Sequence, residues 1–164
     1  MEKKAFFIAN HIFDVTKFIM KSLWFIGLSG VGKSFASEYL KKKIKKSIKV
    51  DGDVIRKYIS YDLDYTLLDR KEQIRRVMGI GKFLIYSNLF PIISTVYMNK
   101  KTFEECKKNK IKVIEIKRNF KQLENNSLYK KNIKNVVGKD IILPNIKTKI
   151  IENSGCKNFY KELN

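Results

Sequence analysis

The sequence predicts a single α/β domain built as a three-layer sandwich, with helices on both faces of a mainly parallel β-sheet. Two observations carry this prediction. Short apolar runs bounded by polar or turn residues are typical of strands that are buried on both faces. Longer segments with apolar residues at helical spacing separate these runs, and strands that alternate with helices imply right-handed crossovers. A length of 164 residues fits one domain over residues 1–164.

The elements are expected in a fixed order along the chain. Residues 22–27 form a buried strand that ends in glycine, and a helix runs from Lys33 past Ile44 to the end of a lysine-rich segment, where cations suit the helix C-terminus. The later strands are expected at 48–50, 89–96, 112–116 and 149–151. The later helices are expected at 70–86 and 157–163.

Residues 1–20 are expected to form an N-terminal extension with an amphipathic helix. Asp14 and Lys17 interrupt its apolar run, which is too short for a membrane span and lacks the small-residue cleavage site of a secretory signal. Met20 is an alternative start. We therefore expect no membrane partner and a cytoplasmic location.

Composition narrows the chemistry. The net charge of +19 invites a nucleic-acid interpretation, but the lysines are scattered and lack interleaved aromatic residues, so solvated helix faces are the simpler explanation and a nucleic-acid partner is not expected. Cys106 and Cys156 are far apart, which suggests neither a disulfide framework nor a zinc site. His11 is the one histidine, so a histidine-based triad or metal site is excluded.

A phosphate-binding motif lies between the first predicted strand and the first predicted helix. Residues 27–34 match G-x-x-x-x-G-K-[ST] at every fixed position. Main-chain amides of such a loop surround the phosphates of ATP, Lys33 is expected to reach the β and γ phosphates, and the Ser34 hydroxyl is expected to bind Mg²⁺. The predicted ATP-binding residues are Gly27, Leu28, Ser29, Gly30, Val31, Gly32, Lys33, Ser34 and Phe35.

Two carboxylates follow the second predicted strand, at the sheet edge where parallel sheets bind ligands. We expect Asp53 to act as the catalytic base and Asp51 to lie on the metal side with Ser34, although the spacing permits the opposite assignment. Catalysis is expected to rest on Asp53, Lys33 and Asp51. A turn followed by a helix N-cap explains the same spacing without any catalytic role.

The chain resembles the adenylylsulfate (APS) kinase family from about Leu23 to Gly155. Four motifs in matching order carry the resemblance: the 27–34 loop, Asp51-Gly52-Asp53-x-x-Arg56, Asp62-Leu63-x-Tyr65, and the 69–76 segment. Residues 128–131 and 133–138 are similar to parts of the family's lid and nucleotide-covering segment, placed here at 118–140.

This resemblance implies a P-loop nucleotide-kinase fold and an enzyme that transfers phosphate from Mg²⁺-bound ATP to the ribose 3′-hydroxyl of a small nucleotide. Similar kinases are often homodimers. Arg56 and Arg70 would hold acceptor anions, and Tyr65 would stack on the acceptor base. The full set of implied acceptor-binding residues is Asp53, Arg56, Tyr65, Arg70, Gln73, Lys134 and Val136.

The acceptor side departs from the family pattern. Tyr65 and Gln73 replace a phenylalanine and an asparagine, and Val136 replaces an aromatic residue that would complete a sandwich around adenine. The segment between Lys131 and Ile133 is shortened, and residues 95–99 replace a Ser-Pro-aromatic-Arg stretch. An intact ATP side beside an altered acceptor side is the pattern expected when the substrate is exchanged. The variant resembles kinases of capsule biosynthesis, in particular cytidine diphosphoramidate kinase, and the alternative acceptor is adenylylsulfate.

Simpler interpretations exist for several of these residues. Arg75 or Arg76 could form a salt bridge with Glu72 along one helix. Tyr65 could be ordinary packing, and Lys130 with Lys131 a solvated face of the lid. An alternative of another class is a basic RNA-binding module that uses nucleotide as a switch.

Overall fold

The computed structural model describes residues 20–119, 123, 129 and 133–164, so most of the predicted N-terminal extension lies outside the described residues. Its sheet has five strands in the order β2-β3-β1-β4-β5, and every neighbouring pair is parallel. The strands are β1 (Ser22–Ile26), β2 (Ser47–Asp51), β3 (Phe90–Thr95), β4 (Ile111–Lys117) and β5 (Lys149–Glu152). The predicted α/β class is confirmed.

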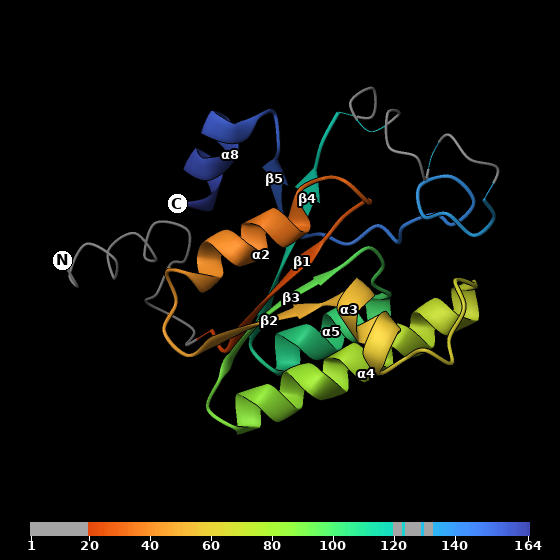
Figure 1. Ribbon diagram of the computed structural model, residues 1–164, viewed down its shortest axis with the longest axis horizontal. Helices are drawn as coiled ribbons and strands as arrows, with labels where there is room; N and C mark the ends of the chain where they lie inside the picture. Colours follow the sequence, from red (N-terminus) through yellow and green to blue (C-terminus); the bar gives the residue numbers. More distant parts are fainter. Residues whose placement is uncertain (1–19, 120–122, 124–128, 130–132) are drawn as a thin grey trace.

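Helices cover both faces of the sheet, as Figure 1 shows, with α2 and α8 on one side and α3, α4 and α5 on the other. Their bounds are α2 (Lys33–Lys41), α3 (Gly52–Tyr58), α4 (Leu67–Tyr86), α5 (Lys100–Lys108) and α8 (Cys156–Leu163). The predicted terminal helix is confirmed, and the long helix begins three residues earlier than expected, after an N-cap at Thr66 whose hydroxyl accepts from Asp69 N.

Helix α5 was not predicted, α3 was considered only as a helix N-cap after the turn at Asp51-Gly52-Asp53, and α2 was predicted too long. Helices α3 and α5 are short, seven and nine residues, and each begins after an Asx N-cap, Asp51 and Asn99. Few of their residues are buried: Ile55 in α3, and Thr102 and Cys106 in α5. Helix α2 ends at Lys41, and the N–H groups of Lys43 and Ile44 donate to the carbonyl oxygen of Leu40 in a closing turn. Ile44 still packs against the core, from outside the helix.

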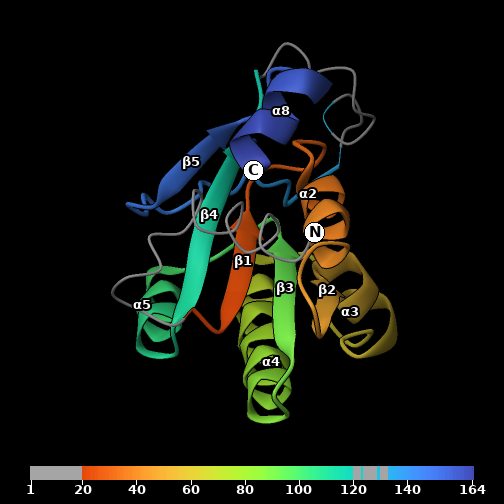
Figure 2. The same cartoon turned by 90° about the vertical axis from the view of Figure 1, so that its left-hand side faces the viewer.

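Strand β1 lies at the centre of the sheet and separates two cores. Leu23 and Phe25 face α2 and α8, whereas Trp24 and Ile26 face α4 and α5, and each of these four side chains is at most 5% exposed. Figure 2 shows β4, β1, β3 and β2 side by side in this arrangement. Parallel strands bring their carboxyl ends to one edge, so the loop after β1 lies beside the ends of β2 and β3.

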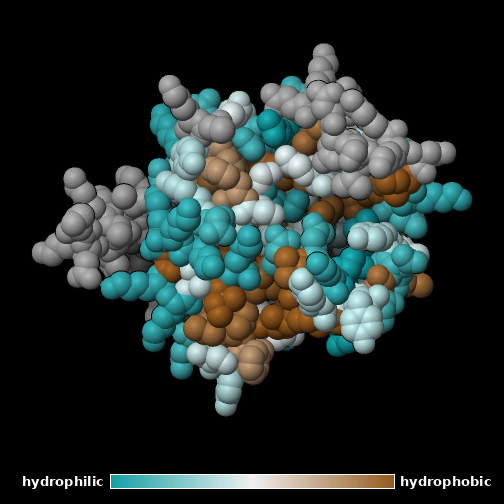
Figure 3. Space-filling view, viewed as in Figure 1, coloured by the Kyte–Doolittle hydropathy of each residue, from teal (hydrophilic) through white to brown (hydrophobic). Residues whose placement is uncertain are grey.

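Apolar side chains are also found at the surface of α4. Leu68 and Phe83 are more than half exposed, and Figure 3 shows apolar surface on the side of the molecule where α4 lies. Within residues 20–119, 123, 129 and 133–164, no helix has the length and apolar character needed to cross a membrane.

Candidate functional site

The loop between β1 and α2 folds as a phosphate cradle. Gly27 begins it with φ of 143°, where a Cβ atom would lie 2.2 Å from the carbonyl oxygen of Ile116, so only glycine fits. Lys33 turns back over the loop and donates from Nζ to the carbonyl oxygens of Gly27 at 2.8 Å and Leu28 at 2.7 Å. The ammonium is thereby held inside the loop, where phosphates would bind.

Burial dominates the electrostatics of Lys33. The side chain is 9% exposed, and loss of hydration lowers its pKa from 10.5 to about 8, although the charges of Asp53 and Asp51 act in the opposite direction. Because the charged form of Lys33 is poorly hydrated, a phosphate bound in the loop would stabilise it strongly.

The predicted ATP-binding residues divide into two groups. Six of them line a cavity of about 290 Å³: Ser29, Gly30, Gly32, Lys33, Ser34 and Phe35. Val31 instead packs in the core beneath α8 and is 1% exposed. The Leu28 side chain packs beneath Gly138, where a Cβ atom would approach it to 2.7 Å. Leu28 and Val31 could therefore contribute only main-chain groups, as Gly27 does.

Asp51 connects the loop to the next strand. Its Oδ2 accepts from Ser34 Oγ at 2.9 Å and from Ser94 Oγ at 3.3 Å, while its Oδ1 accepts from Asp53 N at 3.0 Å and caps α3. The capping explanation of the Asp51-Gly52-Asp53 spacing is therefore correct for Asp51. It does not compete with the metal-side prediction, because the oxygen that meets Ser34 is not the capping oxygen.

The residues present fit a magnesium site of the kind that nucleotides complete. Ser34 Oγ and Asp51 Oδ2 lie 2.9 Å apart beside the cradle and would supply hard oxygen ligands. In the described part of the chain, no group of three or more His, Cys, Asp or Glu side chains could hold a metal ion. Mg²⁺ characteristically takes its remaining ligands from substrate phosphates and water.

Two arginines and an aromatic ring form the acceptor side. Arg56 lies with its Cζ 4.6 Å from the centroid of the Tyr65 ring, and Arg70 with its Cζ 5.4 Å from the same centroid. Burial, followed by the nearby charge of Arg56, lowers the pKa of Arg70. Among the described residues, neither arginine has a carboxylate in an ion pair, so both guanidinium charges could pair with an anion in the cavity.

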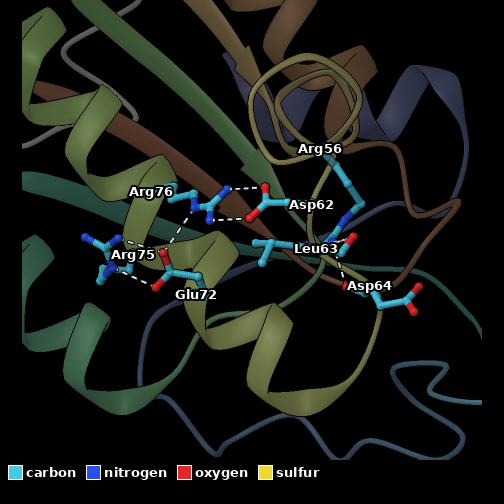
Figure 4. Close-up of polar contacts among 7 residues, drawn as sticks. All are labelled: Arg56, Asp62, Leu63, Asp64, Glu72, Arg75 and Arg76. Atoms are coloured by element: carbon cyan, nitrogen blue, oxygen red, sulfur yellow. Dashed lines mark hydrogen bonds and ion pairs between the residues drawn. The ribbon is translucent and has the colours of Figure 1, made fainter.

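Main-chain carbonyls hold both arginines in place. Arg56 Nη1 donates to the carbonyl oxygens of Leu63 at 3.2 Å and Asp64 at 2.7 Å (Figure 4). Arg70 donates from Nε to Tyr65 O at 3.1 Å and from Nη2 to Asn135 O at 2.8 Å. Arg70 thus ties the start of α4 to the predicted nucleotide-covering segment.

Gln73 carries an unsatisfied acceptor. Its Nε2 donates to the carbonyl oxygen of Gly52 at 3.0 Å, which fixes the orientation of the amide because a carbonyl only accepts. The side chain is 5% exposed and lines the first cavity, and its Oε1 has no hydrogen-bond partner within the described residues. A ligand that offers an N–H or O–H group would satisfy this oxygen.

A second cavity of about 380 Å³ continues from the first, and Lys134, Val136 and Tyr129 contribute to its lining. Both cavities are lined by Ser29, Asp53, Tyr65, Arg70 and Val96. All seven predicted acceptor-binding residues therefore lie around one continuous cleft. Lys130 and Lys131 lie outside the described residues.

The salt-bridge interpretation of the second arginine pair is correct. Arg75 and Arg76 both contact Glu72, and Arg76 also forms a two-pronged ion pair with Asp62 at 2.5 and 2.7 Å (Figure 4). Hydrogen bonds from Arg75 and Arg76 lower the pKa of Glu72 to about 2. Because Asp62 directly precedes the carbonyls that hold Arg56, this network supports the acceptor side.

The cleft also contains residues that the sequence placed near the acceptor only as parts of segments, namely Thr95, Val96, Tyr97 and Asn135, and one that it did not single out, Ser94. Thr95 Oγ1 accepts from the indole N–H of Trp24 at 2.8 Å, so the end of β3 is fixed to β1. One signal was present in the sequence. Asp51 is the last residue of β2 and Ser94 is the next-to-last residue of β3, and the register of these adjacent parallel strands pairs the two.

Comparison with known proteins adds the evolutionary context. The adenylylsulphate kinase family model matches residues 20–141. The adenylyl-sulfate kinase of Buchnera aphidicola (subspecies Acyrthosiphon pisum) is 38% identical over 85 residues, which are 48% of this chain and 41% of that protein. The adenylyl-sulfate kinase of Halothermothrix orenii is 32% identical over 79 residues, 46% of this chain and 43% of that protein. The chain thus spans less than half the length of these curated relatives.

Solved structures confirm the fold. A Mycobacterium tuberculosis APS kinase in complex with AMPPNP and APS matches with a TM-score of 0.69 at 21% identity, covering 87% of this chain and 93% of that one. A sugar kinase from Janibacter matches with a TM-score of 0.62 at 9% identity, covering 88% and 93%. Kinases with different acceptors therefore share this fold, and the fold alone does not identify the acceptor. By the match over residues 20–141, this chain belongs to the adenylylsulphate kinase family.

Proposed function

We propose that the protein is an ATP-dependent kinase that phosphorylates the ribose 3′-hydroxyl of a nucleotide. The observation that carries this proposal is the continuous cleft in which the Lys33 cradle and the Arg56–Arg70 pair face each other across Asp53. One end offers amides and an ammonium to a triphosphate, and the other offers two guanidinium groups to a second anion. Such an arrangement suits the transfer of phosphate between two anionic nucleotides.

The described side chains support a division of roles. Lys33 would neutralise charge on the transferred phosphoryl group, and Ser34 with Asp51 would hold Mg²⁺. When bound, Mg²⁺ would shield the phosphate oxygens and orient them for in-line attack. Asp53 lines both cavities, so it is placed to accept the proton of the attacking hydroxyl between the two substrates.

Adenylylsulfate is the acceptor that the relatives support. The Buchnera and Halothermothrix proteins are named adenylyl-sulfate kinases, and the Mycobacterium structure contains APS. An exocyclic amine, which adenine carries, would satisfy the buried Oε1 of Gln73.

Cytidine diphosphoramidate is a second candidate, and Val136 favours it. Val136 and Tyr65 both line the second cavity, so an aromatic ring is present at one position and an aliphatic side chain at the other. A base site with an aromatic ring on one side only stacks less strongly on a purine than a site with two rings, and it leaves room for a pyrimidine. Cytosine also has an exocyclic amine, which could donate a hydrogen bond to Gln73 Oε1.

A direct comparison of acceptors tests both candidates. ADP release would be measured with Mg·ATP and either adenylylsulfate or cytidine diphosphoramidate, and the product would be checked by mass spectrometry for 3′-phosphorylation. Turnover with one compound identifies the acceptor and excludes the other. ATP binding without turnover on any nucleotide, together with salt-sensitive affinity for RNA, would replace this proposal by the RNA-switch hypothesis.

A further inference from the structure

The phosphate cradle is supported from behind by residues near the C-terminal end of the described chain. Strand β5 leads to Asn153, and α8 lies beside α2, the helix that follows the cradle (Figure 1). Tyr160 contacts the rings of Phe35 and Tyr39 on α2, at centroid distances of 5.3 and 4.9 Å. Asn153 and α8 lie beyond residue 141, where the match to the family model ends.

Asn153 makes the direct contact with the cradle. Its main-chain N–H donates to Lys117 O at 2.8 Å and so extends the β4–β5 pairing by one residue. Its side-chain Nδ2 donates to the carbonyl oxygen of Val31 at 2.8 Å. The amide orientation is unambiguous, because a carbonyl oxygen can accept only from the NH₂ end.

This hydrogen bond fixes the direction of one peptide group. The carbonyl of Val31 and the N–H of Gly32 belong to the same planar trans peptide, so they point in opposite directions. Gly32 lines the first cavity. With Val31 O turned outward to Asn153, the N–H of Gly32 is turned away from Asn153, as a phosphate-binding amide must be.

Close packing at Gly32 reinforces the contact. Gly32 has φ of 106°, and a Cβ atom there would lie 2.7 Å from Asn153 Nδ2 and 3.2 Å from the Phe159 ring. Phe159 is 2% exposed and packs in the core shared by β1, α2 and α8. Asn153 and Phe159 thus pack closely against Gly32, and neither of them lines the first cavity.

We propose that Asn153 is a positioning residue for the triphosphate of ATP, acting by holding the 31–32 peptide so that the Gly32 amide faces the phosphates. This proposal rests on the proposed binding of Mg·ATP. Without the side-chain donor, the peptide is free to adopt the opposite orientation, which would aim a carbonyl oxygen at the phosphates.

The test is the Asn153→Leu variant, which keeps the approximate size and removes the donor. Loss of one such hydrogen bond is expected to weaken Mg·ATP binding by about 3- to 10-fold, measured by titration calorimetry. The KM for ATP should rise by the same factor, while the KM for the acceptor stays unchanged. Asn158→Ala is the matched control. This variant also loses a side-chain hydrogen bond, the one from Asn158 Nδ2 to Ser154 Oγ, but that bond does not involve the cradle.

A second pair of variants covers the case in which the leucine variant does not fold. Asn153→Ser keeps a hydroxyl donor and Asn153→Ala does not, so serine should bind Mg·ATP more tightly than alanine. Equal ATP affinity in wild type and both donor-free variants would overturn the positioning role, as would an equal rise in both KM values. If the wild type itself binds no Mg·ATP, the proposed function fails instead, and the two failures are distinguishable.

Discussion

Replacing Lys33 by methionine tests the electrostatic basis of the site. The fall of its pKa from 10.5 to about 8 corresponds to about 3 kcal/mol, at about 1.4 kcal/mol per pH unit. This is the free energy by which the folded protein destabilises the charged form of Lys33. A bound triphosphate should restore much of this energy by pairing with the ammonium. We therefore expect proton uptake on Mg·ATP binding at mildly alkaline pH.

The size of the uptake follows from the pKa. At pH 8 the free protein holds the Lys33 proton in about half of the molecules, so binding should take up about 0.5 proton per ATP if the triphosphate restores the ordinary value. At pH 9 the figure rises to about 0.9. Without nucleotide, the free energy of unfolding should increase from pH 8 toward 10.5, because over that range the unfolded chain binds the proton that the folded chain has lost.

Calorimetric titrations in buffers of different ionisation enthalpy measure this uptake directly. Lys33→Met should lose both the uptake and most of the affinity, whereas the exposed-site control Lys100→Met should retain both. If the wild type binds Mg·ATP but takes up no proton between pH 8 and 9, the reasoning is refuted, because Lys33 would then already be protonated in the free protein.

Three further predictions concern the catalytic base, the salt-bridge network and stacking of the acceptor base. Asp53→Asn should lower kcat by about 10²–10⁴-fold with little change in ATP affinity, and near-normal kcat would show that Asp53 is not the base. Glu72→Gln should reduce the loss of Tm that accompanies a fall in pH. The lowered pKa of Glu72 stabilises the fold above about pH 4.5, and this contribution is lost as the pH falls toward 2. The same dependence of Tm on pH in wild type and variant would contradict this prediction. Val136→Phe, which adds a second ring to the cavity that Tyr65 lines, should improve kcat/KM for adenylylsulfate relative to cytidine diphosphoramidate by about 3- to 10-fold. A change in the opposite direction would count against stacking of the acceptor base between residues 65 and 136.

The central strands could be predicted from sequence because they are covered on both faces. All five residues of β1 are buried, and four of them, Leu23 to Ile26, are apolar, so the strand is visible in the sequence as a continuous apolar run. Helices α3 and α5 are less evident in the sequence, because each is short, buries few residues and consists largely of polar and charged side chains.

The site shows the same contrast. Lys33, Ser34 and Asp51 belong to local motifs whose spacing is set by the chemistry, and the structure brings them together. Asn153 has no such signature, because its partner is a main-chain carbonyl 122 positions away in sequence, and any residue could supply that carbonyl. Contacts of this kind become visible only when the fold is known.

The position of Trp24 has a practical consequence. It is the one tryptophan in the sequence, it is fully buried, and its indole N–H is bound to Thr95 at the wall of the cleft. Fluorescence excited selectively at the indole, apart from that of the eight tyrosines, therefore reports on one side chain whose hydrogen-bond partner lines the cleft. Substrate screening can thus begin with an optical titration, without coupled enzymes or radioactive nucleotide.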